Sequence, residues 1–78
     1  MYPAVKDVKP ETNYTLLLTF DSGERKRFDM KPYMHLSVFK DLSDVSKFNA
    51  VRVSFDTVEW ENEADFDPEV LFESGVRV

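Results

Sequence analysis

The sequence contains no cysteine and only two glycines among its 78 residues. Without cysteine the chain can form neither a disulfide bond nor a thiolate metal site. So few glycines exclude the glycine-rich loops whose backbone amides hold nucleotide phosphates. The sequence also lacks any apolar run of signal-peptide or membrane-spanning length. We therefore expect a cytoplasmic protein that does not associate with membranes.

Residues that carry catalysis or bind metals are equally scarce. His35 is the only histidine, and it could act as a base only if a carboxylate such as Asp29 or Asp41 oriented it in a cleft. Its apolar neighbours are typical of a core-facing segment instead. The carboxylates between Glu61 and Glu69 lack the glycine that calcium loops commonly place at their sharpest turn. We predict a protein that is not an enzyme and has no catalytic, cofactor or metal site.

The abundant residues are aromatic and aliphatic. Seven Phe, three Tyr and one Trp give a small chain large apolar side chains to bury, which matters because small domains bury a low fraction of their surface. A hydrophobic content of 42% exceeds what disordered segments usually carry. The sequence therefore predicts one folded domain, residues 1–78.

The most regular pattern is the period-two spacing of Tyr14, Leu16, Leu18 and Phe20, which alternate with Thr15, Leu17 and Thr19. This spacing in a segment rich in β-forming residues predicts a strand. The following Asp-Ser-Gly at 21–23 predicts a three-residue hairpin loop whose glycine takes the left-handed conformation. This loop pairs Leu18 with Lys26 in the returning strand. The same register points Phe28 into the core.

The remaining elements are shorter, and together they predict an α+β fold with an antiparallel sheet of four or five strands and short helices packed on one face. In chain order we expect an edge strand at 4–9, helical turns at 33–42, a turn capped by Ser43 or Asp44, strands at 51–55 and 58–60 around a turn at Asp56-Thr57, and a helix at 68–73 capped by Asp67 and ended by Gly75. The predicted core consists of the inward apolar side chains: Leu16, Leu18, Phe20, Phe28, Phe39, Leu42, Val53, Trp60 and Leu71.

Charge is distributed unevenly along the chain. The net charge of −5 divides into +2 over residues 1–55 and −7 over residues 56–78, which we call the acidic segment. Such a segment does not suit a phosphate backbone. It is either a solvated face that keeps the protein soluble or a docking surface for a basic protein. In the second interpretation the partner-binding candidates are Trp60, Glu61, Glu63 and Asp65, although Trp60 also suits a core position.

The one basic run, Arg25-Lys26-Arg27, lies on the second strand of the predicted hairpin. These charges either protect a sheet edge from pairing with another chain or contact nucleic acid. The chain has no helix-turn-helix of its own. In the second interpretation it would be a regulatory module whose association with nucleic acid depends on a partner.

Several short motifs carry a family resemblance over residues 5–72. They are Tyr14-x-Leu16-x-Leu18-x-Phe20-Asp21-x-Gly23-Glu24, Arg27-Phe28-Asp29, Pro32-Tyr33, Val38-Phe39-x-x-Leu42, Phe48, Val51, Trp60 and Asp65-x-Asp67-Pro68-x-x-Leu71-Phe72. In this order they resemble the bacterial family catalogued as domain of unknown function 2442. The chain departs from the family at Thr57, where glycine is usual, and at Glu61 and Glu63, where proline and glycine are usual.

The resemblance implies a small cytoplasmic α+β domain without a known activity and without agreed catalytic or binding residues. Members of the family occur alone or fused to helix-turn-helix modules, and free-standing ones often neighbour a small gene in suspected toxin–antitoxin pairs. Together with the acidic segment, this favours a non-enzymatic protein-interaction module. Its partner would be a basic protein encoded nearby, which the chain neutralises.

Overall fold

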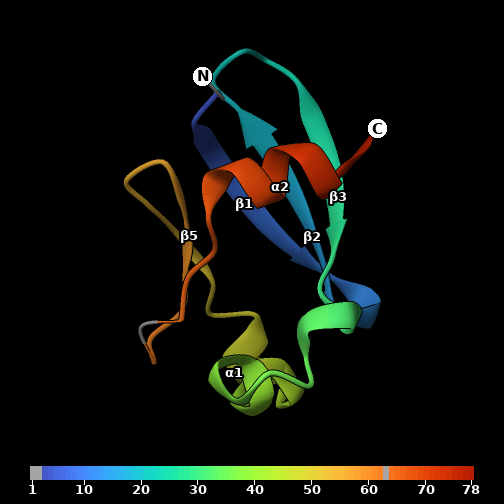
Figure 1. Cartoon of the computed structure of the whole chain (residues 1–78), viewed down its shortest axis with the longest axis vertical. Helices are drawn as coiled ribbons and strands as arrows, with labels where there is room; N and C mark the ends of the chain where they lie inside the picture. The colour runs from blue at the N-terminus through green and yellow to red at the C-terminus, as the bar shows by residue number, and fades with distance from the viewer. Residues whose placement is uncertain (1–2, 63) are drawn as a thin grey trace.

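The computed structural model describes residues 3–62 and 64–78, and it confirms the predicted α+β class. The main sheet is antiparallel and contains, in spatial order, β1 (Val5–Glu11), β2 (Thr15–Phe20), β3 (Arg25–Asp29) and β6 (Val76–Arg77). A separate two-stranded sheet contains β4 (Arg52–Ser54) and β5 (Thr57–Glu59). In Figure 1 helix α2 (Pro68–Ser74) crosses one face of the main sheet, while the other helical turns lie beyond one end of it.

The predicted hairpin is confirmed in register. Leu18 pairs with Lys26, the amide of Phe20 donates to the carbonyl of Glu24 at 2.9 Å, and Gly23 has a φ of 89°. Tyr14 is the exception, because it has a φ of 57° and belongs to the 3₁₀ turn η1 (Thr12–Tyr14) instead of the strand. Its hydroxyl donates to the carbonyl of Ser43 and therefore ties the start of β2 to the helical segment.

The helical segment is made of 3₁₀ turns and one short α-helix: η2 (Lys31–Tyr33), η3 (Ser37–Ser43) and α1 (Val45–Phe48). Phe39 and Leu42 are buried as predicted, whereas Leu36 and Val38 are 41% and 49% exposed. A 3₁₀ helix repeats every three residues, so Val38 cannot share the buried side of Phe39 and Leu42. Leu36 precedes η3 with extended backbone (ψ 138°), so the three-residue repeat does not extend to it. The expectation that the apolar neighbours of His35 face the core is therefore wrong for Leu36 and Val38. No helix among the described residues is long and apolar enough to cross a membrane.

The short helices begin where the sequence predicts. Of the two caps considered for α1, Asp44 is the one used, and its carboxylate accepts from the amide of Ser46 at 3.0 Å. At the start of α2 the carboxylate of Asp67 accepts from the amide of Glu69 at 2.9 Å. The hydrogen bonds from Ser46, its hydroxyl first and its amide second, lower the pKa of Asp44.

Gly75 ends α2 as predicted, but for a reason other than backbone freedom. Its φ is −70°, which any residue adopts. A Cβ at this position would lie 2.9 Å from the carbonyl oxygen of Leu71 and 3.0 Å from the Cβ of Lys26. Glycine therefore allows the chain to pass close to β3 and to pair with it as β6. Two residues are too short to show an alternating pattern, so β6 was not predicted.

The core lies between the inner face of the main sheet, α2, the β4–β5 hairpin and the helical segment. Every residue of the predicted core is buried except Val53, which is half-buried. Phe66 was not predicted, yet its ring packs against Phe39 at 4.7 Å and Phe28 at 5.2 Å between centroids. The buried residues that the patterns did not indicate are Val5, Met30, Phe48, Val58, Ala64 and Phe66.

Candidate functional site

His35 is exposed in the turn between η2 and η3. The carboxylate of Asp29, one candidate to orient it, is already engaged, because it accepts from the amide of Lys31 at 2.9 Å and pairs with the same residue's amine at 3.0 Å. Burial acts to raise the pKa of Asp29, but the contacts with Lys31 outweigh it and the pKa is lowered. Across residues 3–62 and 64–78, no group of three or more His, Cys, Asp or Glu could hold a metal ion.

The basic run divides between the two faces of the sheet. Arg25 and Arg27 are exposed, and Arg27 pairs with Glu11 at 2.9 Å. Lys26 points inward and is only 9% exposed. β3 pairs with β6 at Lys26 and Arg27, so it is not an edge strand there. The interpretation that these two residues protect a sheet edge is therefore wrong, and the three charges do not form one continuous basic patch.

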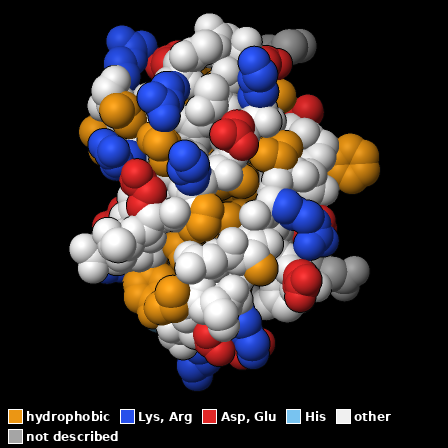
Figure 2. All heavy atoms as spheres, turned by 180° about the vertical axis from the view of Figure 1, so that it is seen from behind, with side chains coloured by type: hydrophobic (Ala, Val, Ile, Leu, Met, Phe, Trp, Pro, Cys, Tyr) orange, Lys and Arg blue, Asp and Glu red, His pale blue; other side chains and the backbone are white. Residues whose placement is uncertain are grey.

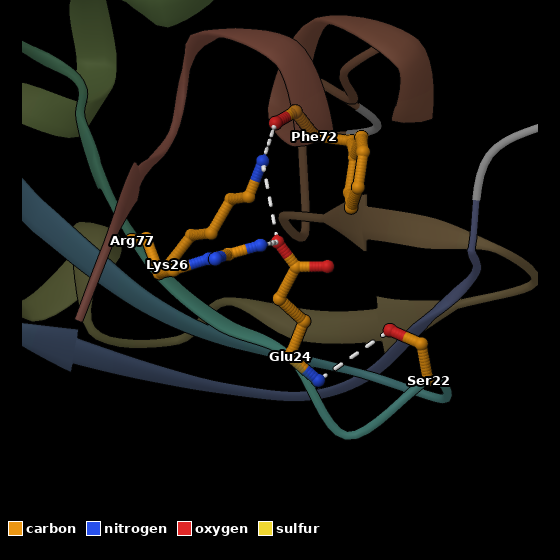
Figure 3. A network of polar contacts seen from close by, with 5 residues as sticks. All are labelled: Ser22, Glu24, Lys26, Phe72 and Arg77. Carbon is orange, nitrogen blue, oxygen red and sulfur yellow. Dashed lines mark hydrogen bonds and ion pairs between the residues drawn. The ribbon is translucent and has the colours of Figure 1, made fainter.

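The amine of Lys26 contacts groups of the protein itself, on Phe72 and Glu24 (Figure 3). It donates to the carbonyl of Phe72, lies 3.7 Å from the centroid of that residue's ring, and is 3.9 Å from the carboxylate of Glu24. Glu24 also pairs with Arg77 at 2.9 Å. These contacts join β3, α2 and β6. The amine of Lys26 is therefore engaged in contacts within the fold.

The face of the sheet opposite α2 shows no uniform charge. Figure 2 views this face and shows Lys and Arg side chains intermixed with Asp and Glu, with hydrophobic side chains between them. The strands place alternate residues on it, and in β3 these are the exposed residues Arg25, Arg27 and Asp29. Mixed charges of this kind give little attraction for a phosphate backbone.

The tryptophan of the acidic segment is part of the core. Trp60 is 1% exposed, and its indole N–H donates to the carbonyl of Phe48 at 2.9 Å. Its ring lies 6.1 Å from the rings of Phe39 and Phe48 between centroids. The core interpretation of Trp60 is confirmed, and any partner would reach no more than the edge of its side chain.

The other partner-binding candidates lie on a tight loop after β5. The amide of Trp60 donates to the carbonyl of Ala64 at 3.0 Å, and the Asn62 side chain accepts from the amide of Ala64 at 3.1 Å. Glu61 and Asp65 are both exposed. Glu63 lies outside the described residues. These two hydrogen bonds hold Ala64 against Trp60 and Asn62, next to the exposed carboxylates.

A pocket of about 250 Å³ lies between this loop and the helical segment. We call it the Trp60 pocket, because the nearly buried side chains of Trp60 and Leu42 lie at its apolar wall. Its rim carries Asp41, Glu61 and Lys47, and the lining is completed by Ala50 and Asn62. The pocket is large enough for one side chain of a partner.

Ion pairs compensate the acidic segment only in part. Glu59 pairs with Arg52 across the β4–β5 hairpin at 3.2 Å. Asp56, Glu61 and Asp65 are exposed and form no ion pair with any described residue. Their negative charges therefore face solvent and are not neutralised by a basic side chain of the described residues.

The tip of the β4–β5 hairpin carries a residue that the sequence patterns misplaced. Phe55 continues the alternation of Val51 and Val53, which predicted a strand residue, but it is the first of two loop residues and is 98% exposed. Its φ is 55°. The predicted turn at 56–57 is thus shifted to 55–56. A glycine here would have indicated the turn, and its absence removed the signal.

Comparison with known proteins gives one family. The family model described as "Protein of unknown function (DUF2442)" matches residues 5–77. No curated protein and no solved structure matches the chain.

Proposed function

The chain belongs to the DUF2442 family, whose description names no function, and we propose that it is a cytoplasmic protein-interaction module without enzymatic activity. Its partner is a basic protein. In line with the gene arrangement that the family resemblance implies, the partner is the product of an adjacent gene, which this chain neutralises by binding.

The observation that carries the proposal is a set of exposed carboxylates without ion pairs in the acidic segment, one of which, Glu61, lines a pocket. Asp56, Glu61 and Asp65 form no ion pair within the described residues, whereas Arg27 of β3 and Lys31 of η2 are exposed but paired. These three charges therefore do not stabilise the fold through ion pairs with the described residues. Unpaired charge of one sign attracts an oppositely charged partner and increases the rate of encounter.

The Trp60 pocket supplies the second element that an interaction surface needs. Glu61 belongs both to the charged loop and to the pocket rim, so a Lys or Arg at the partner's surface can pair with Glu61 while an adjacent apolar side chain enters the pocket. Interfaces of this kind place a small apolar centre inside a polar rim. The pocket thus gives specificity to an attraction that charge alone leaves unspecific.

The proposal is tested by co-purification of the chain with the product of the adjacent gene, at low and at raised salt. The test variant is the double reversal Glu61→Lys and Asp65→Lys, which we expect to slow association about tenfold. The control is Asp7→Lys with Asp21→Lys, which changes the net charge equally at exposed positions elsewhere.

Each result has a defined consequence. Retention that weakens with salt, with slower association in the test variant alone, supports the proposal. Equal slowing in both variants would show a dependence on net charge and not on this surface. A folded wild-type chain that retains no protein would remove the proposal altogether.

A further inference from the structure

Phe55 combines two unfavourable properties at one position. Its side chain is 98% exposed, although it is one of the largest apolar groups in the chain. Its φ of 55° lies in the left-handed region, which bulky residues rarely adopt. Of the two loop residues only Phe55 has a positive φ, the pattern of a type II′ turn, whose first position favours glycine.

The surrounding structure holds the loop in this conformation. Ser54 pairs with Thr57 to close the hairpin. The carbonyl of Asp56 accepts from the amide of Val5 at 3.0 Å, and the hydroxyl of Thr57 donates to the carbonyl of Phe66 at 2.6 Å. The tip is therefore attached both to the main sheet and to the loop before α2. In Figure 1 the hairpin lies at the side of the molecule, next to β1 of the main sheet.

The ring adds almost nothing to the packing of the described residues. Among the aromatic contacts of the described residues, none involves Phe55. Single exposed apolar residues are common and need no explanation, but this one also occupies a strained backbone position. Strain that the fold does not use is found at binding sites, where it fixes a group in advance.

We infer that Phe55 is the hydrophobic anchor of the chain, and that it inserts into an apolar pocket bordered by Lys or Arg on the partner protein. This inference rests on the proposed function and names the contact by which the partner is held. A rigid aromatic side chain has few rotatable bonds, so its immobilisation costs little entropy. Buried aromatic residues of this kind dominate binding energy in many interfaces.

Charge identifies the occupant as a basic protein. Asp56 follows Phe55 directly, is exposed, and has no ion pair among the described residues. A lipid surface with anionic headgroups would repel this tip, and so would a second copy of a chain whose net charge is −5. A partner pocket with a basic rim accommodates the ring and pairs with Asp56 at the same time.

The test compares three chains for their affinity to the protein retained by the wild type. Phe55→Gly removes the ring without removing any buried contact, and we expect its affinity to fall by about tenfold or more. Val76→Ser is the control, because Val76 is also exposed, at 71%, but lies in β6. Its affinity should match that of the wild type.

A second measurement locates the contact. A photo-crosslinking benzoylphenylalanine at position 55 should link to the same partner, at apolar residues flanked by Lys or Arg. Links to lipid or to a second copy of the chain would overturn the inference.

The outcomes separate the two proposals. Binding by Phe55→Gly that equals wild-type binding would overturn the role of Phe55 and leave the proposed function standing. If the wild type retains no protein, both fail.

Discussion

The amine of Lys26 lies 3.7 Å from the centroid of the Phe72 ring and donates a hydrogen bond to the backbone carbonyl of the same residue. This pairing explains how a lysine in the core of a small domain is tolerated. A buried charge is costly unless polar groups replace its water, and here a carbonyl, an aromatic face and the carboxylate of Glu24 do so. Lys26 thereby fastens β3 to the last turn of α2.

We predict that Lys26→Ala lowers the free energy of unfolding by about 1–3 kcal/mol, because it removes a buried stem and the hydrogen bond from Lys26 to the Phe72 carbonyl. Lys26→Met keeps most of the volume and should cost less. Arg25→Ala, at an exposed position on the same strand, should change stability by less than about 0.5 kcal/mol. Urea unfolding of the three variants measures these values. Equal stability of Lys26→Ala and wild type would show that the contact with Phe72 does not form.

A substitution at the hairpin tip should instead increase the stability of the protein. Phe55→Gly should raise the free energy of unfolding by about 0.5–1 kcal/mol, because relief of the left-handed strain exceeds the entropy that glycine loses on folding. Phe55→Ala keeps the Cβ and therefore the strain, so its stability should stay within about 0.5 kcal/mol of the wild type. The gain corresponds to a melting temperature higher by roughly 2–8 °C. A melt of Phe55→Gly below that of the wild type would contradict the positive φ.

The cap of α1 makes stability depend on pH. Hydrogen bonds from Ser46 lower the pKa of Asp44 in the folded state, so its contribution is complete above the ordinary aspartate value of about 3.9 and is lost as pH falls through the lowered pKa. Asp44→Asn removes this dependence. We therefore expect wild type to be more stable than Asp44→Asn at pH 7, with the difference shrinking below pH 4. NMR titration of the Asp44 carboxyl gives its pKa directly, and a value at or above the ordinary one would refute the cap.

The parts of the fold that could be predicted are those in which local sequence and tertiary structure agree. The register of Leu18 with Lys26 followed from the period-two pattern and from a glycine at the one loop position that needs it. The inward position of Lys26 was implicit in that register, but a charged residue is normally assigned to the surface. Burial came from Phe72, more than forty residues away in sequence, and such a contact leaves no local pattern.

The candidate site was predictable in its charge and only in part in its apolar residues. The excess of carboxylates after residue 55 is visible in the sequence, and the structure leaves Glu61 and Asp65 exposed. Trp60 is buried, as the core prediction gave it, whereas Phe55, predicted as a strand residue, is exposed at a hairpin tip. The tryptophan is buried by contacts with Phe39 and Phe48, and the phenylalanine is exposed because the chain turns one residue earlier than the alternation indicates.

Phe66 gives the strongest test of the core. It lies between Asp65 and Asp67 in a segment with no periodicity, so its sequence context favours a surface position, yet it is 8% exposed and its ring contacts Phe28 and Phe39.

Phe66→Ala should therefore cost about 3–5 kcal/mol, the range for truncation of a buried phenylalanine, and should unfold much of a domain whose total stability is only about 5–15 kcal/mol. Phe66→Leu retains most of the apolar volume and should remain folded with a smaller loss. Phe28→Ala should be as damaging as Phe66→Ala, because the two rings fill the same cluster. Thermal and urea unfolding of the three variants decides the matter. If Phe66→Ala melts like the wild type while Phe28→Ala does not, Phe66 lies outside the core and the chain between β5 and α2 follows a different path.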